Sequence, residues 1–349
     1  MAAPRTARAS LIAALAAGVA LGTGALAAAA PTAYVVAGLN VIAVPLDGSA
    51  PARVVSTGND SSGLRGLVLD PAHGQLFTSQ AMNKHIRSAP LAAGTPLTDI
   101  NLTGATVTWP AGLSIDPTSG TVYWGDEANR LGRTAIDGSG ASLLSLGGVT
   151  PTKTYGVAYE PGQHLLWWTD LAPGGAIHAT PTDGALTTTL GTGSASVWNS
   201  YALAVDRGGN RVYWTNGGYG AFNDGGVMRA ALDGSGGERI VARDLARGIA
   251  LDTAAHTVYW VEAASGPAVR LFRASMDGGD VTEVPLGGLA SGTAEGLALL
   301  MPPVASGPAL SGSTTVGSPL SCAAAWQGDS PEAFAFRAPA SSSLRWLRD

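Results

Sequence analysis

The stretch VYWGD at residues 122–126 decides the fold, because related stretches recur at regular intervals along the chain. The copies read LFTSQ from residue 76, LWWTD from 166, VYWTN from 212 and VYWVE from 258. Each copy is rich in aromatic and β-branched residues, as β-strands require. Repetition of one strand motif predicts a fold assembled from similar β units.

The segments around each copy repeat as well. An apolar strand that ends in a carboxylate precedes each copy, and these carboxylates are 46, 44, 46 and 46 residues apart. A third strand follows and mostly ends at an Asp-Gly pair, which supplies the positive φ of a tight hairpin before a fourth strand. The carboxylates are Asp70, Asp116, Glu160, Asp206 and Asp252, and the Asp-Gly turns begin at Asp47, Asp137, Asp183, Asp233 and Asp277.

Four antiparallel strands in units of this length are typical of a β-propeller blade. Five complete units start near residues 66, 112, 156, 202 and 248, while residues 34–55 hold only the last three strands of another. Its missing first strand returns at residues 296–300. We therefore predict an all-β protein, in which a six-bladed β-propeller spans residues 31–303 and is closed by a C-terminal strand.

The motifs VYWGD, LWWTD and VYWTN, with GL-x-x-D before them and LDGSG after them, resemble the YWTD repeat. This is the class B repeat of low-density lipoprotein receptor relatives, and the resemblance covers about 270 residues. It implies a six-bladed propeller that recognises protein partners. The chain departs from the family pattern at the last motif position, which is Gln80, Asp126, Asp170, Asn216 and Glu262 in successive units.

Composition excludes several classes of protein. Of 349 residues, 46% are hydrophobic and only 13% are charged, which does not fit a disordered acidic chain. The 48 glycines disfavour a helical bundle, because glycine destabilises a helix interior. A single cysteine excludes a disulfide-stapled scaffold. With a net charge of -5 and no cationic patch, the chain is not expected to bind nucleic acid.

The N-terminal residues have the order of a secretory signal. Arg5 and Arg8 precede an apolar stretch at residues 11–26, and small residues follow up to Pro31. We expect residues 1–30 to be removed, so that the mature chain has no membrane span, and an uncleaved membrane anchor is the alternative. The protein is therefore predicted to be secreted or displayed on the cell surface.

The C-terminal residues 304–349 carry no further repeat. They begin as a linker rich in Ser, Gly and Ala, and the runs VGSPLSC, Trp326-Gln327-Gly328 and LRWLRD resemble the opening of a bacterial immunoglobulin-like repeat. We expect an incomplete immunoglobulin-like β segment that folds poorly alone. Cys322 would then lack a disulfide partner within the chain.

Most repeated side chains have a structural interpretation. The second-strand tryptophans are expected to fill the space between blades, and the first-strand carboxylates to accept turn amides. Asp126, Asp170 and Glu262 could line a cation site, but an inter-blade hydrogen bond is the simpler interpretation. The histidines of equivalent turns lie in different blades, so they cannot converge on one metal. They are His73, His164 and His256.

The residues expected just before each innermost strand form the candidate ligand-binding site. They are spaced 46, 44, 46, 46 and 48 residues apart, so we expect them to form a ring at the channel mouth. Arg and Tyr, which are enriched at binding hot spots, occupy four of the six positions. Flanking residues and the loop at 217–226 lie on the same face. The candidate residues are Arg65, Trp109, Tyr155, Trp198, Asn199, Tyr201, Tyr219, Phe222, Arg247 and Glu295, and Ala111 completes the ring.

Two classes of function remain open. The first is a non-catalytic module, expected to be monomeric, that recognises an extracellular protein, peptide or glycan without a cofactor. The alternative is a metal-dependent lactonase-type hydrolase with a divalent cation in the channel, which needs several oxygen ligands. The ring offers only Glu295, so Asn199, Asp126 or Glu262 would have to join it. No catalytic residue is assigned, and recognition is favoured over catalysis. A purely architectural spacer is a third alternative.

Overall fold

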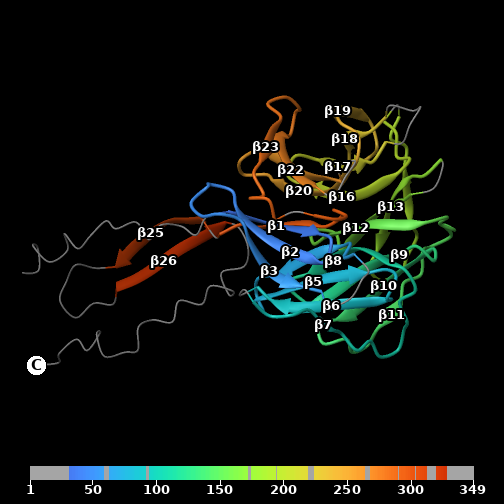
Figure 1. Ribbon diagram of the computed structural model, residues 1–349, viewed down its shortest axis with the longest axis horizontal. Helices are drawn as coiled ribbons and strands as arrows, with labels where there is room; N and C mark the ends of the chain where they lie inside the picture. The colour runs from blue at the N-terminus through green and yellow to red at the C-terminus, as the bar shows by residue number, and fades with distance from the viewer. Residues whose placement is uncertain are drawn as a thin grey trace, which may run out of the picture.

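The structure is a computed structural model. It describes residues 31–58, 63–91, 94–171, 174–193, 195–218, 224–263, 268–289, 291–302, 304–312 and 320–327. Within these ranges the regular elements are all β-strands (Figure 1). None of the described segments is a helix with the length and apolarity that crossing a bilayer requires.

The described strands form six four-stranded antiparallel sheets, which confirms the predicted propeller. Five sheets follow chain order from the inside outward. The first two sheets consist of β4 (Leu67–Asp70), β5 (Gln75–Gln80), β6 (His85–Pro90) and β7 (Thr98–Asp99), and of β8 (Pro110–Asp116), β9 (Thr121–Asp126), β10 (Arg130–Ala135) and β11 (Ser142–Leu143). The next two consist of β12 (Thr154–Glu160), β13 (Leu165–Asp170), β14 (Ile177–Pro181) and β15 (Thr188–Leu190), and of β16 (Ser200–Asp206), β17 (Arg211–Asn216), β18 (Gly226–Ala231) and β19 (Glu238–Ala242). The fifth consists of β20 (Ala246–Asp252), β21 (Thr257–Ala263), β22 (Val269–Ser275) and β23 (Thr282–Val284).

The remaining sheet joins the two ends of the propeller. Its inner strand β24 (Leu297–Leu300) pairs with β1 (Thr32–Ala37), and β2 (Asn40–Pro45) and β3 (Arg53–Thr57) complete it. The inner strands contact one another in the order β24, β4, β8, β12, β16 and β20, and β20 contacts β24. The ring is therefore closed by strand pairing between its two ends.

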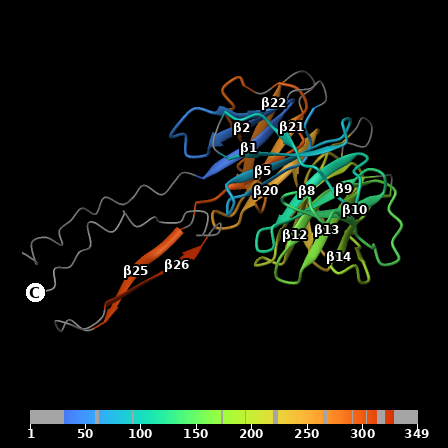
Figure 2. The same cartoon turned by 90° about the horizontal axis from the view of Figure 1, so that it is seen from below.

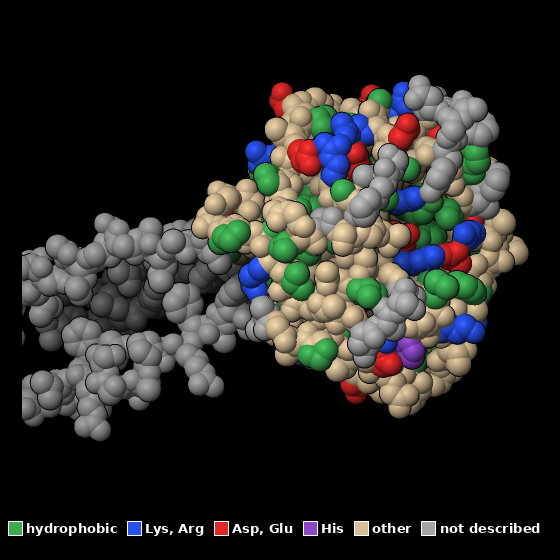
Figure 3. All heavy atoms as spheres, in the orientation of Figure 1, with side chains coloured by type: hydrophobic (Ala, Val, Ile, Leu, Met, Phe, Trp, Pro, Cys, Tyr) green, Lys and Arg blue, Asp and Glu red, His purple; other side chains and the backbone are tan. Residues whose placement is uncertain are grey.

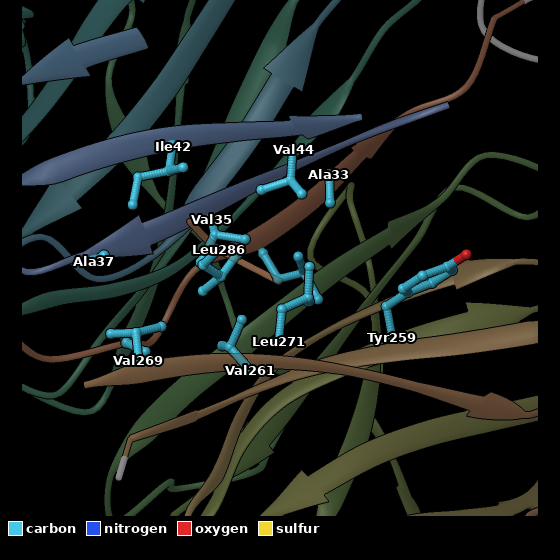
Figure 4. Close-up of a cluster of buried hydrophobic side chains, with 12 residues drawn as sticks. Ala33, Val35, Ala37, Ile42, Val44, Tyr259, Val261, Val269, Leu271 and Leu286 are labelled. Atoms are coloured by element: carbon cyan, nitrogen blue, oxygen red, sulfur yellow. The ribbon is translucent and has the colours of Figure 1, made fainter. Parts of the chain in front are cut away.

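An apolar cluster lies between this closing sheet and the neighbouring sheet β20–β23. Figure 4 shows Val35 and Ile42 of the closing sheet in one cluster with Val261, Val269 and Leu271 of β21 and β22. All of these side chains are buried. Because the cluster draws on both ends of the propeller, burial of its apolar surface holds the ring closed.

The motif strands explain how neighbouring sheets pack. The four expected tryptophans are fully buried, and they lie in apolar clusters between sheets. The fourth residue of the motif adds a polar link between neighbouring sheets in three of the units. The Thr169 hydroxyl donates to the carbonyl of Ser200 in the next sheet at 3.0 Å and accepts from Gly156 N at 2.9 Å. Ser79 and Thr215 hydroxyls bond in the same way to the carbonyls of the following sheets.

The first-strand carboxylates cap their own turns, as predicted. Asp116 accepts from Thr118 N at 3.0 Å, and Glu160 accepts from Gly162 N at 2.6 Å. The Asp-Gly turns also have the expected geometry, with φ of 87° at Gly138 and 85° at Gly278. Both features are local, which is why they can be predicted from the repeat alone.

Small residues let the inner strands approach closely. A Cβ placed on Gly112 would lie 2.7 Å from Tyr155 O and 2.9 Å from Val157 N of the next inner strand. Gly248 meets Glu295 O and Leu297 N of its neighbour at the same two distances. Gly112 in β8 and Gly248 in β20 therefore lack a side chain because the neighbouring backbone occupies its space.

Beyond the propeller, β25 (Val304–Gly312) and β26 (Leu320–Gln327) form a two-stranded antiparallel sheet of their own. It is drawn to the left of the propeller in Figures 1 and 2. Cys322 lies in β26 opposite Leu310. The rest of the expected immunoglobulin-like segment and the predicted signal at residues 1–30 lie outside the described residues.

Candidate functional site at the channel mouth

The six inner strands enclose a channel with a cavity of about 70 Å³. Its wall is formed mainly by the small residue and the following aliphatic residue of each inner strand. At one end it is lined by Tyr155, Tyr201, Ala111 and Glu295, which are four of the six predicted ring positions. The repeat spacing therefore brings these residues together at the mouth, as expected.

The ring positions differ in how the backbone presents them. Arg65 and Glu295 precede β4 and β24 by two residues, as predicted, but the other four lie inside longer strands. The prediction that these four precede their strands was therefore wrong. The pairing of their strands shifts register at this point, which is a β-bulge or similar irregularity. Bulges re-aim side chains at the rims of β structures. The four residues are Ala111, Tyr155, Tyr201 and Arg247.

A hydrogen bond crosses the mouth. The Tyr155 hydroxyl donates to Glu295 Oε2 at 2.6 Å, although the two residues are 140 positions apart and belong to opposite sheets of the ring. Arg65 approaches the same carboxylate, with Nε 3.5 Å from Oε2. The Arg65 guanidinium also lies 5.6 Å from the centre of the Tyr155 ring. These three side chains close one end of the channel.

Two charged residues that the sequence did not single out complete the network. Glu127, in the turn between β9 and β10, accepts a hydrogen bond from Arg65 Nη1 through one oxygen. Its other oxygen lies 2.7 Å from Lys153 Nζ. Lys153 occupies the same repeat register as Trp109 and Asn199, 44 residues after the first and 46 before the second, so the register could have identified it. Glu127 follows the last motif position, where the other units carry Ala81, Leu171, Gly217 and Ala263, so no repeated signal marks it.

The opposite part of the mouth is aromatic and basic. The Arg247 guanidinium lies 3.4 Å from the centre of the Tyr201 ring, which is a close cation–π contact. Tyr201 in turn meets Tyr155 edge to face, with ring centres 5.2 Å apart. Tyr155, Tyr201, Ala111 and Leu171 form one apolar cluster. The mouth thus has an apolar floor and a charged rim.

Burial and charge set the ionisation of these groups. Burial, followed by the nearby Glu295 carboxylate, raises the pKa of Tyr155 well above its usual value, so the phenol stays protonated and donates. Burial lowers the pKa of Arg247, and the charge of Glu295 only partly opposes this. Burial also opposes the charge of Arg65, but Tyr155, Glu295 and Glu127 together raise its pKa. Burial and the Glu295 carboxylate therefore act on all three of these side chains.

The flanking candidates lie on the loops around this network. Trp109 is 42% exposed, and its carbonyl accepts from Glu127 N at 3.0 Å. Trp198 and Asn199 are partly buried, and Asn199 has a φ of 57°. Tyr219 and Phe222 lie outside the described residues. The described residues around the mouth are therefore those of the ring, of the loops that lead into β8, β12 and β16, and of the β9–β10 turn.

The motif carboxylates are engaged by the protein itself. Asp126 accepts from Thr108 N at 2.8 Å, from Trp109 N at 3.0 Å and from Arg130 Nη2 at 2.7 Å. Asp170 accepts from Thr152 N and Lys153 N, both at 2.8 Å. These bonds hold the loop that leads into the inner strand of the same sheet. We expected a hydrogen bond between blades at these positions, and the structure has hydrogen bonds within one blade instead.

The ligands suggested for a channel cation do not fit one. Glu295 is held by Tyr155 and Arg65, while Glu262 is held by Arg243 and by Trp260 Nε1 at 3.0 Å. A cation beside Glu295 would also face the charge of Arg65. Within the described part of the chain, no three His, Cys, Asp or Glu side chains gather as metal ligands do. The donors present suit hydrogen-bonded structure rather than coordination of a divalent ion.

The histidines are dispersed, as predicted. His164 and His256 have φ of 53° and 51° in equivalent turns, where His164 Nδ1 meets Tyr159 Oη and His256 Nε2 meets Asp277, at 2.8 and 2.9 Å. His178 is buried and stacks on Trp168, with ring centres 4.1 Å apart. Burial lowers the pKa of His178. These contacts are local to each blade.

Comparison with known proteins identifies the fold. No known protein family matches the chain, and no curated protein matches it in sequence. A chain of the nidogen/laminin complex is similar in structure, with a TM-score of 0.61, 15% identity and coverage of 78% of this chain and 98% of that one. A putative TolB from Agrobacterium tumefaciens gives a TM-score of 0.53 at 15% identity, covering 73% of this chain and 88% of its own.

A gluconolactonase from Xanthomonas campestris is also similar, with a TM-score of 0.51, 19% identity and coverage of 65% of this chain and 76% of its own. At these identities the similarity extends to the arrangement of strands and no further. The chain is therefore a six-bladed β-propeller, as its YWTD-like repeats imply.

Proposed function

We propose that the protein is a secreted or cell-surface recognition module that binds a protein or peptide partner on the channel-mouth face of the propeller. The observation that carries the proposal is the ring itself. The six positions that are equivalent by repeat carry four different residue types, Arg, Tyr, Glu and Ala. Their polar side chains contact one another at the mouth, and no single contact is repeated from blade to blade. Diversity at equivalent positions is what a specific binding face requires, because a repeated structural role would favour one residue type.

Exposed apolar side chains beside the ring support the same face. Trp109 is 42% exposed, and Met82 in the turn between β5 and β6 is 68% exposed. Figure 3 shows basic and acidic side chains beside one another on the face it presents, without one dominant charge. A mixture of apolar anchors and paired charges suits a protein partner better than a polyanion. The similarity to a chain of the nidogen/laminin complex is consistent with this proposal.

Export is part of the proposal. The order of residues 1–30, with two arginines before an apolar stretch and small residues after it, supports a secretory signal. A lactonase-type hydrolase, the alternative, gains no support from the mouth. Its supposed ligands are bonded to Arg65, Arg130 and Arg243, so we do not propose it.

The test is affinity capture from the culture medium and envelope of the organism that makes the protein. The bait is the full chain, compared with a Trp109→Ala/Arg65→Ala variant. A matched control is Leu186→Ala, because Leu186 is also exposed but lies in the turn between β14 and β15, at the other end of the sheets. We expect the double variant to lose a partner that the control keeps, with both variants checked by thermal melts. Equal loss in both, or no loss in either, would contradict the proposal.

A further inference from the structure

The segment that leaves the outer strand β7 presents three polar side chains to solvent. Ile100 and Leu102 pack against the apolar cluster between the sheets β4–β7 and β8–β11, whereas Asp99, Asn101 and Thr103 are exposed. This is the alternation of an extended chain, in which successive side chains point to opposite sides. The three polar side chains therefore share the outer side of the segment.

Asn101 and Thr103 are held at the surface by backbone contacts alone. Thr103 N donates to Gly138 O at 3.0 Å, and Ala141 N donates to Thr103 O at 2.9 Å, so the segment is tied to the β10–β11 turn of the next sheet. Within the described part of the chain, neither the Asn101 amide nor the Thr103 hydroxyl has a hydrogen-bond partner. Both side chains are thus exposed and uncommitted.

The same residues form an acceptor sequence for N-linked glycosylation. Asn101-Leu102-Thr103 matches Asn-x-Ser/Thr with x other than proline, a motif that marks a surface loop in an exported protein. Asp99 extends it to Asp-x-Asn-x-Thr, and bacterial oligosaccharyltransferases favour an acidic residue at this position. The sequence has one other such run, Asn59-Asp60-Ser61, where Thr57 takes the place of the acidic residue. That run lies outside the described residues.

We propose that Asn101 carries an N-linked glycan in the exported protein. The donor is an oligosaccharide on a polyprenyl pyrophosphate. The Asn101 side-chain nitrogen bonds to the anomeric carbon, the bond from that carbon to the pyrophosphate oxygen breaks, and the lipid pyrophosphate leaves. The amide gives up one proton to a base of the transferase. The inference rests on the export that is part of the proposed function, because this transfer takes place outside the cytoplasm.

The site lies on the outer rim, away from the channel mouth. It pairs with the turn at Gly138, which follows the last residue of β10, Ala135. The first residue of that strand, Arg130, bonds to Asp126 on the mouth side, and a strand of six residues spans about 17 Å. A bulky, hydrophilic glycan on Asn101 would therefore cover the rim and leave the mouth open to a partner.

The test analyses tryptic peptides of the protein, isolated from the medium and envelope of the organism that makes it, by mass spectrometry. Trypsin separates the two runs, because Asn59 falls in residues 54–65 and Asn101 in residues 88–130. We expect a glycan on Asn101 and none on Asn59. Asn101→Gln and Thr103→Val should abolish the modification of residues 88–130, while Asn59→Gln and Thr103→Ser should retain it. The last pair isolates the hydroxyl, because valine and serine differ in whether they keep it.

Three outcomes would overturn the inference. They are an unmodified Asn101 in the exported protein, a glycan on Asn59 alone, and a glycan that survives Thr103→Val. Capture of a partner through Trp109 and Arg65 is measured on the same preparation. If Asn101 is unmodified while capture persists, the proposed function stands and this inference alone falls. If Asn101 is glycosylated while no partner is captured, the reverse holds, and absence of the protein from medium and envelope would remove both.

Discussion

The Tyr155 hydroxyl reaches Glu295 at 2.6 Å across the channel, joining two sheets that lie opposite one another in the ring. Tyr155 is on β12, and Glu295 precedes the strand that closes the propeller. The bond therefore links the middle of the chain to its closure. Because the donor is buried and the acceptor is charged, this is among the stronger types of hydrogen bond in a protein.

Tyr155→Phe should therefore destabilise the propeller. Loss of a hydrogen bond to a charged group costs about 1.5 to 3 kcal/mol, and Glu295 would lose this bond while it keeps the ion pair with Arg65. The measurement is the free energy of unfolding in urea at pH 7.5. Stability equal to that of the parent chain would show that the bond across the channel contributes nothing to closure.

The same variant should change the dependence of stability on alkaline pH. Burial and Glu295 raise the pKa of Tyr155 in the folded protein above the ordinary value of 10.0. The folded state then holds a proton that the unfolded state releases, so the stabilisation is complete below pH 10 and is lost as pH rises above it. The free energy of unfolding, measured between neutral pH and about pH 10.5, should fall less steeply with pH for Tyr155→Phe than for the parent chain. Identical slopes would contradict the raised pKa.

The repeat spacing predicts which residues form the ring at the mouth. It does not predict which of their side chains pair with one another. Spacing alone placed Tyr155 and Glu295 at one mouth, because equivalent positions in a closed array of blades face the same axis. Which side chains then pair depends on contacts across the channel between residues far apart in sequence. Glu127 could not be found this way, since alanine, leucine or glycine occupies its equivalents.

Strand boundaries at the mouth were misjudged for a local reason. Tyr201 was expected to precede its strand, but β16 begins at Ser200 and accommodates the extra residue by a shift in register. A bulge leaves the alternation of side chains on either side of it intact, so the sequence pattern gives no sign of it. The apolar pattern starts after the bulge, which is where the predicted strand started.

Thr169→Val should weaken the link between two neighbouring sheets. The hydroxyl both donates to Ser200 O and accepts from Gly156 N, and a valine of the same shape would leave those buried groups unpaired at a cost of about 1 to 3 kcal/mol. Val261 occupies the equivalent position in β21, so the shape is tolerated. The exposed Thr188→Val is the control, and urea unfolding of both variants is the measurement. Equal stabilities would exclude the hydroxyl as a link.

Gly112→Ala should strain the channel wall. The added Cβ would lie 2.7 Å from Tyr155 O and 2.9 Å from Val157 N. Both atoms belong to the backbone of the next inner strand, so the strain can be relieved only if the two sheets separate. Overpacking of this kind costs about 1 to 3 kcal/mol. Gly191→Ala is the matched control, because nothing lies within 4 Å of the added carbon there. Thermal melts should separate the two variants, and equal melting temperatures would show that the inner strands have room.

His178 should make the propeller sensitive to mild acid. Burial lowers the pKa of His178 from the ordinary 6.5, so the unfolded chain takes up a proton before the folded one does. The free energy of unfolding should then fall as pH drops below 6.5, until the folded histidine is protonated too. His178→Phe keeps an aromatic ring against Trp168 and should show a flatter profile in urea between about pH 7.5 and 5.5. Parallel profiles would mean that another group titrates in this range.

Asp126 tests whether the motif carboxylate is a structural group or a metal ligand. It is fully buried and accepts bonds from Thr108 N, Trp109 N and Arg130, which an amide cannot all reproduce. Asp126→Asn should therefore cost about 2 to 3 kcal/mol, against little for the exposed Asp183→Asn. Calcium added to chelated protein distinguishes the two roles, because a bound ion raises the melting temperature of the native state. If the carboxylate holds the loop that carries Trp109, the parent chain and Asp126→Asn should both melt independently of calcium, with the variant melting lower. A calcium-dependent rise confined to the parent chain would instead assign Asp126 to a cation, and the arginine beside it would then have to move.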